Sequence, residues 1–424
     1  MDTNMIQALI IFLLTYALML ALPKYRHIVA IASAALYVIL GILPLGNILH
    51  AIDFNVLLML AGTMAIVTLF IDSSMPQRIA DSLLARTSNV CWAIVALALF
   101  AGVVSAFVDN VATLLIVAPV GLAIAKRLDV PPVPVLIAIS VSSNLQGAAT
   151  LVGDTTSILL GGYADMDFLD FFFMNGRFGI FWAVELGAVA TIPVLYMIFR
   201  KYKGKAPAAD PVDVRDFFPS YLLILLVALL ILASFIPDKP AITNGLICVG
   251  LGLIGTVRAM ARGGAASLKK VIMEIDYVTL LLLAGLFVVI AGITEAGVID
   301  EIGRLFINVS GGNQFLVYTL LVFGSVLFSA FIDNIPYVAT MLPVVTVIAQ
   351  TLSIDPTLMY FGLLTGATLG GNLTPIGASA NITAIGILRR EGYEVKVKDF
   401  LKIGAPFTIV AVLVGYVFIW FVWR

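Results

Sequence analysis

The segment Ser105-Ala-Phe-Val-Asp-Asn110 occurs twice in this chain, the second time as Ser329-Ala-Phe-Ile-Asp-Asn334. Each copy is a polar break near the centre of a long apolar stretch, 91–128 in the first half of the chain and 315–350 in the second. Each arm of these stretches has ~18 residues, or about 27 Å as an α-helix. An arm of that length fits a full bilayer crossing or half of a re-entrant hairpin, and hydropathy does not separate the two.

The two copies belong to an extended internal repeat. Asp109 recurs as Asp333, 224 residues later, and upstream Asp53 recurs as Asp276 at a spacing of 223. The spacing of 224 also relates Pro119 to Pro343, Gly147 to Gly371, Thr150 to Thr374 and Gly153 to Gly377. A constant spacing over so many polar and glycine positions indicates a duplicated chain.

The composition is that of a membrane protein. Of the 424 residues, 61% are hydrophobic and 12% are charged, and the mean hydropathy is +1.10. Soluble domains carry roughly 25% charged residues, so lipid is the expected surrounding. The net charge of −1 leaves no basic excess for nucleic acid. We therefore expect an all-α polytopic fold with the lipid bilayer, and no nucleic acid, as partner.

Ten apolar segments are long enough for spanning helices, which need ~20 residues. They cover 6–22, 28–45, 54–71, 133–162, 181–199, 220–236, 242–257, 277–294, 357–388 and 404–423. With the N-terminus outside, 20 of the 24 Lys and Arg residues fall on the inner side. Because basic loops stay in the cytoplasm, this predicts an inner-membrane protein with both termini outside.

A polar linker at 201–219 divides the chain into near-equal halves, 1–200 and 220–424. Each half then holds five transmembrane helices plus one hairpin. Because five is odd, the second copy should be inverted relative to the first. Inverted repeats with broken helices at matching positions are typical of secondary transporters, whose site lies at the repeat interface near the midplane.

The broken helices are expected within 133–162 and 357–388. There the segments Asn144–Ser157 and Thr368–Asn381 are rich in glycine and hydroxyl residues, and the second contains a proline. Unwound backbone at membrane depth is tolerated only where it is buried or lines an aqueous cavity. The resumed helix ends then offer amide donors for an anion, and carbonyls with carboxylates offer oxygens for a cation.

Asp109 and Asp333 could simply cap the second hairpin arm, since Asp is a strong N-cap. Asp154 differs, because its repeat partner is Ala378 and symmetry alone does not require an acid there. We expect any Na⁺ site near Asp109, Asp154 or Asp333. The full set of expected substrate- or ion-binding residues is Asp109, Asn110, Thr113, Asn144, Gly147, Thr150, Gly153, Asp154, Thr155, Ser157, Asp333, Asn334, Asn372, Thr374, Gly377, Ser379 and Asn381.

No Lys or Arg is expected deep inside a span, so an anion would be held by amides, hydroxyls and helix ends without a fixed basic partner. No ATP-binding loop and no pairing of nucleophile with base is visible. The chain is therefore expected to have no enzyme activity and no cofactor, and to use Na⁺ or H⁺ as coupling ion.

The strings Ser105–Asn110, Gly147–Ser157 and Gly370–Asn381 resemble the ion transporter superfamily. The nearest groups are arsenite permeases, the melanosomal P protein and D-type sodium/proton antiporters, with P-protein-like sequences closest. The resemblance covers roughly 50–420. It implies re-entrant hairpins at 91–128 and 315–350, a homodimer, and an elevator-like moving domain.

Two departures from the family's sequence pattern narrow the range of candidate substrates. Many relatives read Gly-Asp-Pro-Pro-Asn after the first break, where this chain reads Gly153-Asp-Thr-Thr-Ser157. Divalent-anion members carry Ser-Asn-Thr at both hairpin tips, which argues against a dicarboxylate here. The leading hypothesis is a secondary active transporter of a small anion or arsenite-like oxyacid, coupled to Na⁺ or H⁺. The alternative is a sodium/proton antiporter with no anion substrate.

Overall fold

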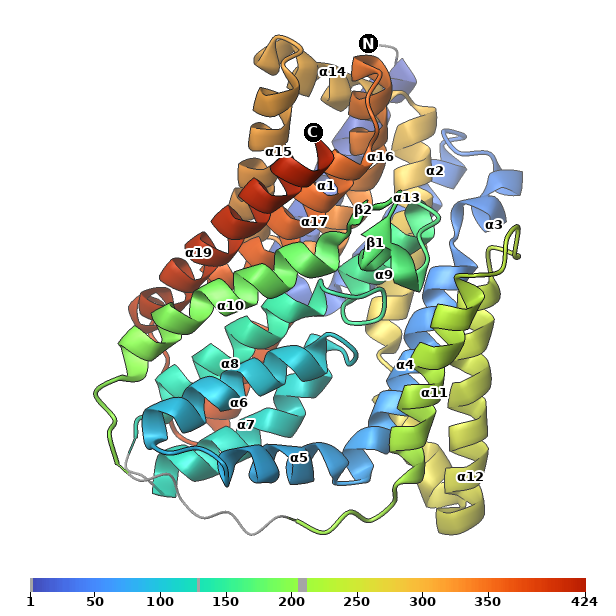
Figure 1. Cartoon of the computed structure of the whole chain (residues 1–424). Coiled ribbons are helices and arrows are strands. Elements are labelled where there is room, and N and C mark those ends of the chain that lie inside the picture. The colour runs from blue at the N-terminus through green and yellow to red at the C-terminus, as the bar shows by residue number, and fades with distance from the viewer. Residues whose placement is uncertain (1–2, 128–129, 205–211) are drawn as a thin grey trace.

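The computed structural model describes residues 3–127, 130–204 and 212–424, and these are nearly all helical (Figure 1). The α-helices of the first half are α1 (Thr3–Ala21), α2 (Arg26–Ile39), α3 (Ile48–Ala51), α4 (Phe54–Asp72), α5 (Met75–Leu84), α6 (Val90–Ser105), α7 (Asn110–Arg127), α8 (Pro132–Gly147), α9 (Thr155–Tyr163) and α10 (Ile180–Phe199). Those of the second half are α11 (Phe218–Ala233), α12 (Thr243–Glu274), α13 (Tyr277–Glu295), α14 (Val298–Ser310), α15 (Gln314–Ser329), α16 (Asn334–Leu352), α17 (Thr357–Gly370), α18 (Ser379–Arg390) and α19 (Val397–Trp423). Two short strands, β1 (Phe173–Met174) and β2 (Arg177–Phe178), form an antiparallel hairpin before α10.

The helices account for every expected span. By length and composition, eight helices in the described part of the chain could cross a membrane, or nine if the bent pair of α14 and α15 counts as one. One loop prediction was wrong: the segment after 257 continues α12 to Glu274, across a kink at Gly264 where φ is +66°. The amphipathic α5 and α14 were not predicted as helices.

The two halves begin their helices with the same capping residues. Asp53 accepts from the Val56 amide at the start of α4, and its repeat partner Asp276 accepts from the Thr279 amide at the start of α13, each at 3.0 Å. The same holds for α6 and α15, which are capped by Asn89 and Asn313. Because a side-chain oxygen at this position satisfies an otherwise free amide, the duplicated caps fix matching helix starts.

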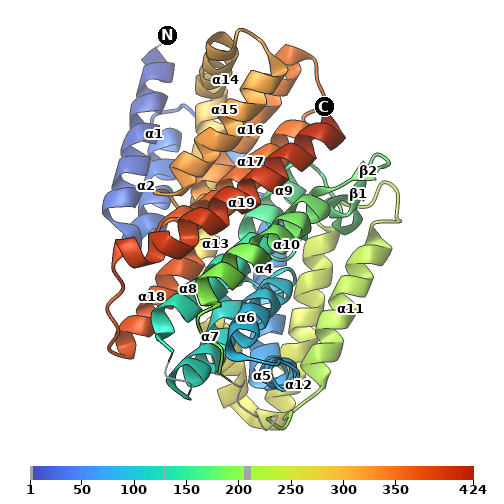
Figure 2. The same ribbon diagram turned by 60° about the vertical axis from the view of Figure 1, so that its left-hand side comes forward.

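The packing partners also match between the halves. Helix α4 packs on α12, and its counterpart α13 packs on α2; likewise α6 packs on α8 and α15 on α17. Helices α10 and α19, the last of each half, lie side by side (Figure 2). Figure 1 shows α5 at one end of the molecule and its counterpart α14 at the opposite end. This arrangement is what an inverted repeat would produce.

Small residues let the paired helices approach closely. A Cβ at Gly62 of α4 would lie 2.2 Å from the Cys248 carbonyl carbon of α12, so only glycine fits there. In the other half, a Cβ at Gly285 of α13 would lie 2.8 Å from the Ala30 backbone of α2. Membrane helices without a hydrophobic drive between them gain stability from such close backbone contact.

The start of α1 and the end of α19 lie at the same end of the molecule, and the described residues that flank 205–211 lie at the other (Figure 1). The described end of the linker is anchored there, because Arg215 donates its amide to the Ser73 carbonyl at 3.0 Å. The Arg258 guanidinium, 2.5 Å from Asp216, holds the pKa of that carboxyl below its usual range. The rest of the expected linker, 205–211, with its basic Lys205, lies outside the described residues, as does 128 at the end of the first expected hairpin.

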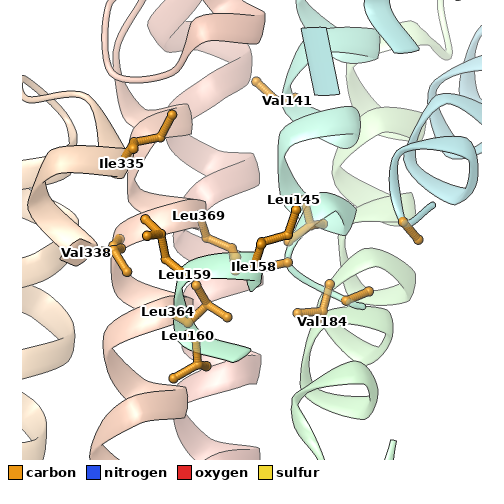
Figure 3. Packing of buried hydrophobic residues seen from close by; sticks show 14 of the residues in the cluster. Val141, Leu145, Ile158, Leu159, Leu160, Val184, Ile335, Val338, Leu364 and Leu369 are labelled. Carbon is orange, nitrogen blue, oxygen red and sulfur yellow. The ribbon is translucent and has the colours of Figure 1, made fainter. Parts of the chain in front are cut away.

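The broken helices meet in an apolar core near the middle of the molecule. Figure 3 shows Leu145 of α8, Ile158 of α9 and Leu369 of α17 converging, and all three are fully buried. Helix α17 is buried along its whole length and α8 from Val135 onward, whereas α1, α12 and α19 keep apolar residues exposed. The breaks therefore lie in the interior, and the exposed apolar faces fit contact with lipid.

Substituting Gly62 by Ala should destabilise the protein, because the α4 and α12 backbones must separate to admit the methyl group. Overpacking of this kind costs roughly 1–3 kcal/mol. The matched control is Gly250→Ala on α12, where an added Cβ meets nothing within 4 Å. We expect the thermal midpoint of the detergent-purified protein to fall for Gly62→Ala and to stay or rise for Gly250→Ala. Equal midpoints for the two variants would contradict the close-packed pairing.

Candidate functional site

The tips of the two helical hairpins are capped in the same way. Asp109 accepts hydrogen bonds on Oδ1 from the Val111 and Ala112 amides, at 3.0 and 3.2 Å. Asp333 accepts on Oδ1 from the Ile335 amide at 3.1 Å. Both aspartates therefore cap the second arm, and in each the second carboxylate oxygen, Oδ2, is not used by the cap.

Each hairpin tip is tied to the break in the following helix. Thr150, between α8 and α9, donates its hydroxyl to the Ala106 carbonyl, and Thr374 donates to the Ala330 carbonyl in the second half. A Cβ at Gly153 would lie 2.7 Å from the Ser105 carbonyl oxygen of the tip, and one at Gly377 would lie 2.7 Å from the Ser329 carbonyl oxygen. The tips and breaks therefore touch backbone to backbone, and the duplicated threonines and glycines are what allow it.

Buried amide side chains join the two halves across the breaks. Asn144 of α8 donates to the Thr368 carbonyl at 2.7 Å and to Asn372 Oδ1 at 3.1 Å, and it accepts from Asn110 at 3.0 Å. Asn372 in turn donates to the Val141 carbonyl at 2.9 Å. All of these groups are buried, so the network supplies partners to polar atoms that lipid cannot satisfy.

The first turns of α9 and α18 close the breaks from the other side. Ser157 donates to the Gly147 carbonyl at 3.4 Å, and its counterpart Asn381 donates to the Gly371 and Thr374 carbonyls at 3.1 and 3.2 Å. Asn381 also accepts from Ser140 at 2.5 Å. These two side chains satisfy freed carbonyls, which gives them a clear structural role.

Asp154 is a buried carboxylate at the start of α9, with 4% of its surface exposed. It accepts from the Thr156 hydroxyl at 3.0 Å and from the Asn334 amide at 3.5 Å, so it joins the break of one half to the hairpin tip of the other. Ala378 has the same extended backbone at the start of α18, with φ near −142° against −141° for Asp154. The two halves therefore share the backbone geometry at this position, and only the first half has an acidic side chain, that of Asp154, there.

A cavity of about 240 Å³ lies beside Asp154. It runs along the half of α4 nearer the linker, from Leu60 to Ile71, and between the two hairpin tips. Its polar lining comprises Arg26, Thr63, Thr68, Asp109, Asn110, Asp154, Thr155, Glu274, Asp276, Thr279, Asn334 and Ser379. The two half-sites therefore contribute to one space, with an excess of carboxylates over basic groups.

Arg26 is the basic residue that the sequence analysis missed at this site. It was assigned to an inner loop, but it forms the first residue of α2 and its Nη1 lies 2.5 Å from Asp333 Oδ2. Both side chains are largely buried, at 22% and 16% exposed. The expectation of a site without a fixed basic partner is thus wrong. A charge at the start of an apolar run does not reveal a partner more than 300 residues away.

A second, larger cavity of about 900 Å³ approaches the same helices from their opposite ends. It touches α4 at Asp53 and Asn55, α13 at Thr294 and Glu295, and α9 at Tyr163. The smaller cavity touches the other ends of α4 and α13 and the start of α9. The molecule thus has one hollow at each end of α4, α9 and α13.

The expected site residues fall into two groups. Those that line the smaller cavity are Asp109, Asn110, Gly153, Asp154, Thr155, Asn334 and Ser379. The remainder, which hold the breaks and tips together, are Thr113, Asn144, Gly147, Thr150, Ser157, Asp333, Asn372, Thr374, Gly377 and Asn381. Glu274, Asp276, Thr63, Thr68 and Thr279 line the cavity but were not expected.

Among the described residues, no group of three or more His, Cys, Asp or Glu side chains is placed to hold a metal ion.

Known proteins resemble this chain along nearly its whole length. The chain is 31% identical to an uncharacterized transporter of Mycobacterium tuberculosis and 29% identical to a 46 kDa membrane protein of Mycobacterium leprae, with 97% of both chains covered in each case. It is 26% identical to the human P protein, over 94% of this chain and 58% of the P protein.

Among solved structures, the YdaH transporter of Alcanivorax borkumensis has the same fold, with a TM-score of 0.61 at 15% identity over 88% of this chain and 86% of that one. MtrF of Neisseria gonorrhoeae matches with a TM-score of 0.55 at 14% identity over 87% and 80%. The model of the citrate transporter family, CitMHS, matches residues 14–366 and 292–424. The chain therefore belongs to the citrate transporter family of the ion transporter superfamily, which confirms the resemblance drawn from its hairpin tips and breaks.

Proposed function

We propose that this chain is a secondary active transporter that moves a small anion across the inner membrane, driven by Na⁺ or H⁺. The observation that carries the proposal is the cavity between the two hairpin tips, where buried carboxylates, opened helix ends and one guanidinium face a common space. The chain belongs to a family whose model is described as a citrate transporter. Carboxylates are therefore candidate substrates again, together with the arsenite-like oxyacids.

The cation half of the cycle rests on Asp109 and Asp154. Both line the same cavity. In the described part of the chain neither forms a salt bridge, whereas Asp333 is neutralised by Arg26. Two unneutralised carboxylates in a low-dielectric setting repel each other, so a cation or proton between them is strongly favoured. We propose that they bind the coupling ion.

The anion half rests on helix ends and on Arg26. The first amides of α9, next to Asp154, and of α18, next to Ser379, point toward the breaks and carry partial positive charge. Thr155 and Ser379 add hydroxyl donors within the cavity lining. An anion entering with a cation would meet complementary groups of both signs, which explains why one cavity could serve both.

Alternating access follows from the two hollows. With the orientation expected from the basic residues, the cavity at Asp154 lies on the cytoplasmic side and the larger one on the outer side, where both termini would lie. We propose that the hairpins and broken helices move as a body against α4 and α13, as in an elevator, and that two copies form a homodimer. Both features come from the family resemblance.

The second candidate function is a sodium/proton antiporter without an anion substrate. The specific observation that favours it is the charge of the cavity lining, where Asp109, Asp154, Glu274 and Asp276 face one arginine that already has a partner. A free polyanion would meet net negative charge unless cations enter first. The two functions differ in whether an anion is required for ion movement.

Replacing Asp154 by Asn should abolish most gradient-driven uptake of the substrate anion into proteoliposomes. The neutral amide can neither take up a proton nor balance the charge of a bound Na⁺. Asp109→Asn is expected to act in the same direction. The matched control is Asp399→Asn, which removes an exposed carboxylate paired with Lys402 outside the cavity. Uptake at the wild-type rate in both Asp109→Asn and Asp154→Asn would rule out their role in coupling.

Ligand-induced thermal stabilisation of the purified protein should separate the two candidate functions. A ligand that binds only the folded state at 100 times its Kd stabilises it by roughly 2.7 kcal/mol. The panel is Na⁺, Li⁺ and K⁺ at several pH values, then citrate, succinate, arsenite, sulfate and phosphate. We expect an anion to raise the midpoint, and to raise it more with Na⁺ or at lower pH. Stabilisation by Na⁺ or pH alone would favour the antiporter.

A further inference from the structure

Arg26 is the only lysine or arginine among the described residues that line the smaller cavity. Its Nη1 donates to Asp333 Oδ2 at 2.5 Å, and both side chains are removed from most of the solvent. A guanidinium has further N–H donors in a rigid fork that matches a carboxylate, so it is suited to recognise this group. In this structure, the Asp333 carboxylate of the protein itself occupies that position.

Asp333 does not need Arg26 for its structural task. It caps α16 through Oδ1, and it presents Oδ2 to Arg26 and to the Ser379 hydroxyl, which donates at 3.4 Å. Its repeat partner Asp109 caps α7 through Oδ1, and among the described residues it forms no salt bridge. The Arg26–Asp333 ion pair is therefore not required for capping the helix, because Asp109 caps α7 without such a pair.

We infer that Arg26 is the carboxylate-recognising residue of the transport site, and that Asp333 Oδ2 holds its place until a substrate carboxylate displaces it. The inference rests on the proposed function, in which an anion is carried. The exchange replaces one guanidinium–carboxylate pair by another, so the arginine never stays buried without a counter-charge. That avoids the several kcal/mol that an unpaired buried ion costs.

The same pair joins parts of the molecule that have to separate if the hairpin moves. Arg26 begins α2, and Asp333 lies at the tip between α15 and α16. Beside it, Tyr16 of α1 donates to the Pro336 carbonyl at 2.6 Å, so α1 and α2 together hold the first turn of α16. A substrate carboxylate that binds Arg26 in place of Asp333 breaks one of these two contacts. Binding would then favour movement of the tip.

The test measures carboxylate binding to the purified full-length protein at fixed Na⁺ and pH, by isothermal calorimetry with citrate and succinate. The variants are Arg26→Gln, Arg26→Lys, Asp333→Asn and the double variant. The control is Arg258→Gln, which breaks an ion pair of the same 2.5 Å length and similar exposure outside the cavity. Each variant is first checked for a monodisperse, cooperatively unfolding sample.

Asp333→Asn should tighten carboxylate binding by roughly tenfold, because the competitor has lost its charge, and Arg26→Gln should weaken it by at least as much. The double variant should bind as weakly as Arg26→Gln, since the gain requires the arginine. Arg26→Lys should keep part of the affinity and Arg258→Gln all of it. If Arg26→Gln fails to fold, the other two variants still test the inference. Carboxylate affinity should rise in Asp333→Asn and fall in Arg26→Lys.

Weaker binding in Asp333→Asn, or unchanged binding in Arg26→Gln, would overturn the inference and leave the pair a structural tie. Either result leaves the proposed function standing, provided that the wild-type protein binds a carboxylate. If the wild type binds neither carboxylate but responds to arsenite or sulfate, Arg26 does not recognise carboxylates. If it binds no anion at all, the proposed function itself fails.

Discussion

The requirement that opened backbone inside a membrane must find hydrogen-bond partners governs this structure. Between α8 and α9, and again between α17 and α18, the helix stops and frees amides and carbonyls where lipid could not satisfy them. The hairpin tips supply the partners, through Thr150 on Ala106 and Thr374 on Ala330. Tip and break therefore form a unit, and neither could persist at this depth alone.

That unit explains what the sequence could and could not predict. The glycines, threonines and aspartates of tip and break are local and duplicated, so the repeat, the positions of the tips and the interrupted helices could be located from spacing. Spacing left open whether 91–128 and 315–350 are re-entrant or fully spanning, and only the family resemblance implied re-entrant hairpins. The kinked extension of α12 past 257 could not be predicted, because its charged residues have the composition of a loop and most of its side chains are exposed, so no apolar pattern marks it as a helix. Contacts between the halves, such as Asn144 with Asn372, also leave no local pattern.

Ten of the 17 predicted site residues support the breaks and tips and do not line the cavity. The reason is physical: the same residue types that bind ions and anions also satisfy freed carbonyls and amides. Asn381 and Ser157 are of this kind, since their side chains bond to carbonyls of the preceding break. Sequence spacing identifies the neighbourhood of the site, whereas the direction in which each polar atom points is decided by packing.

The function of the site depends on where the two halves differ. A perfectly symmetric site would place equal charges at both tips and at both breaks. Here Asp154 has no acidic counterpart, since Ala378 begins α18, and Arg26 neutralises Asp333 but leaves Asp109 without an ion-pair partner among the described residues. At the tips and breaks, the carboxylates without a salt-bridge partner are therefore Asp109 and Asp154 of the first half, whereas Arg26 pairs with the tip of the second. Glu274 and Asp276 add two carboxylates from the second half to the same cavity. Under the proposed function, a cation would bind near the carboxylates and an anion near Arg26, a division that exact symmetry would not provide.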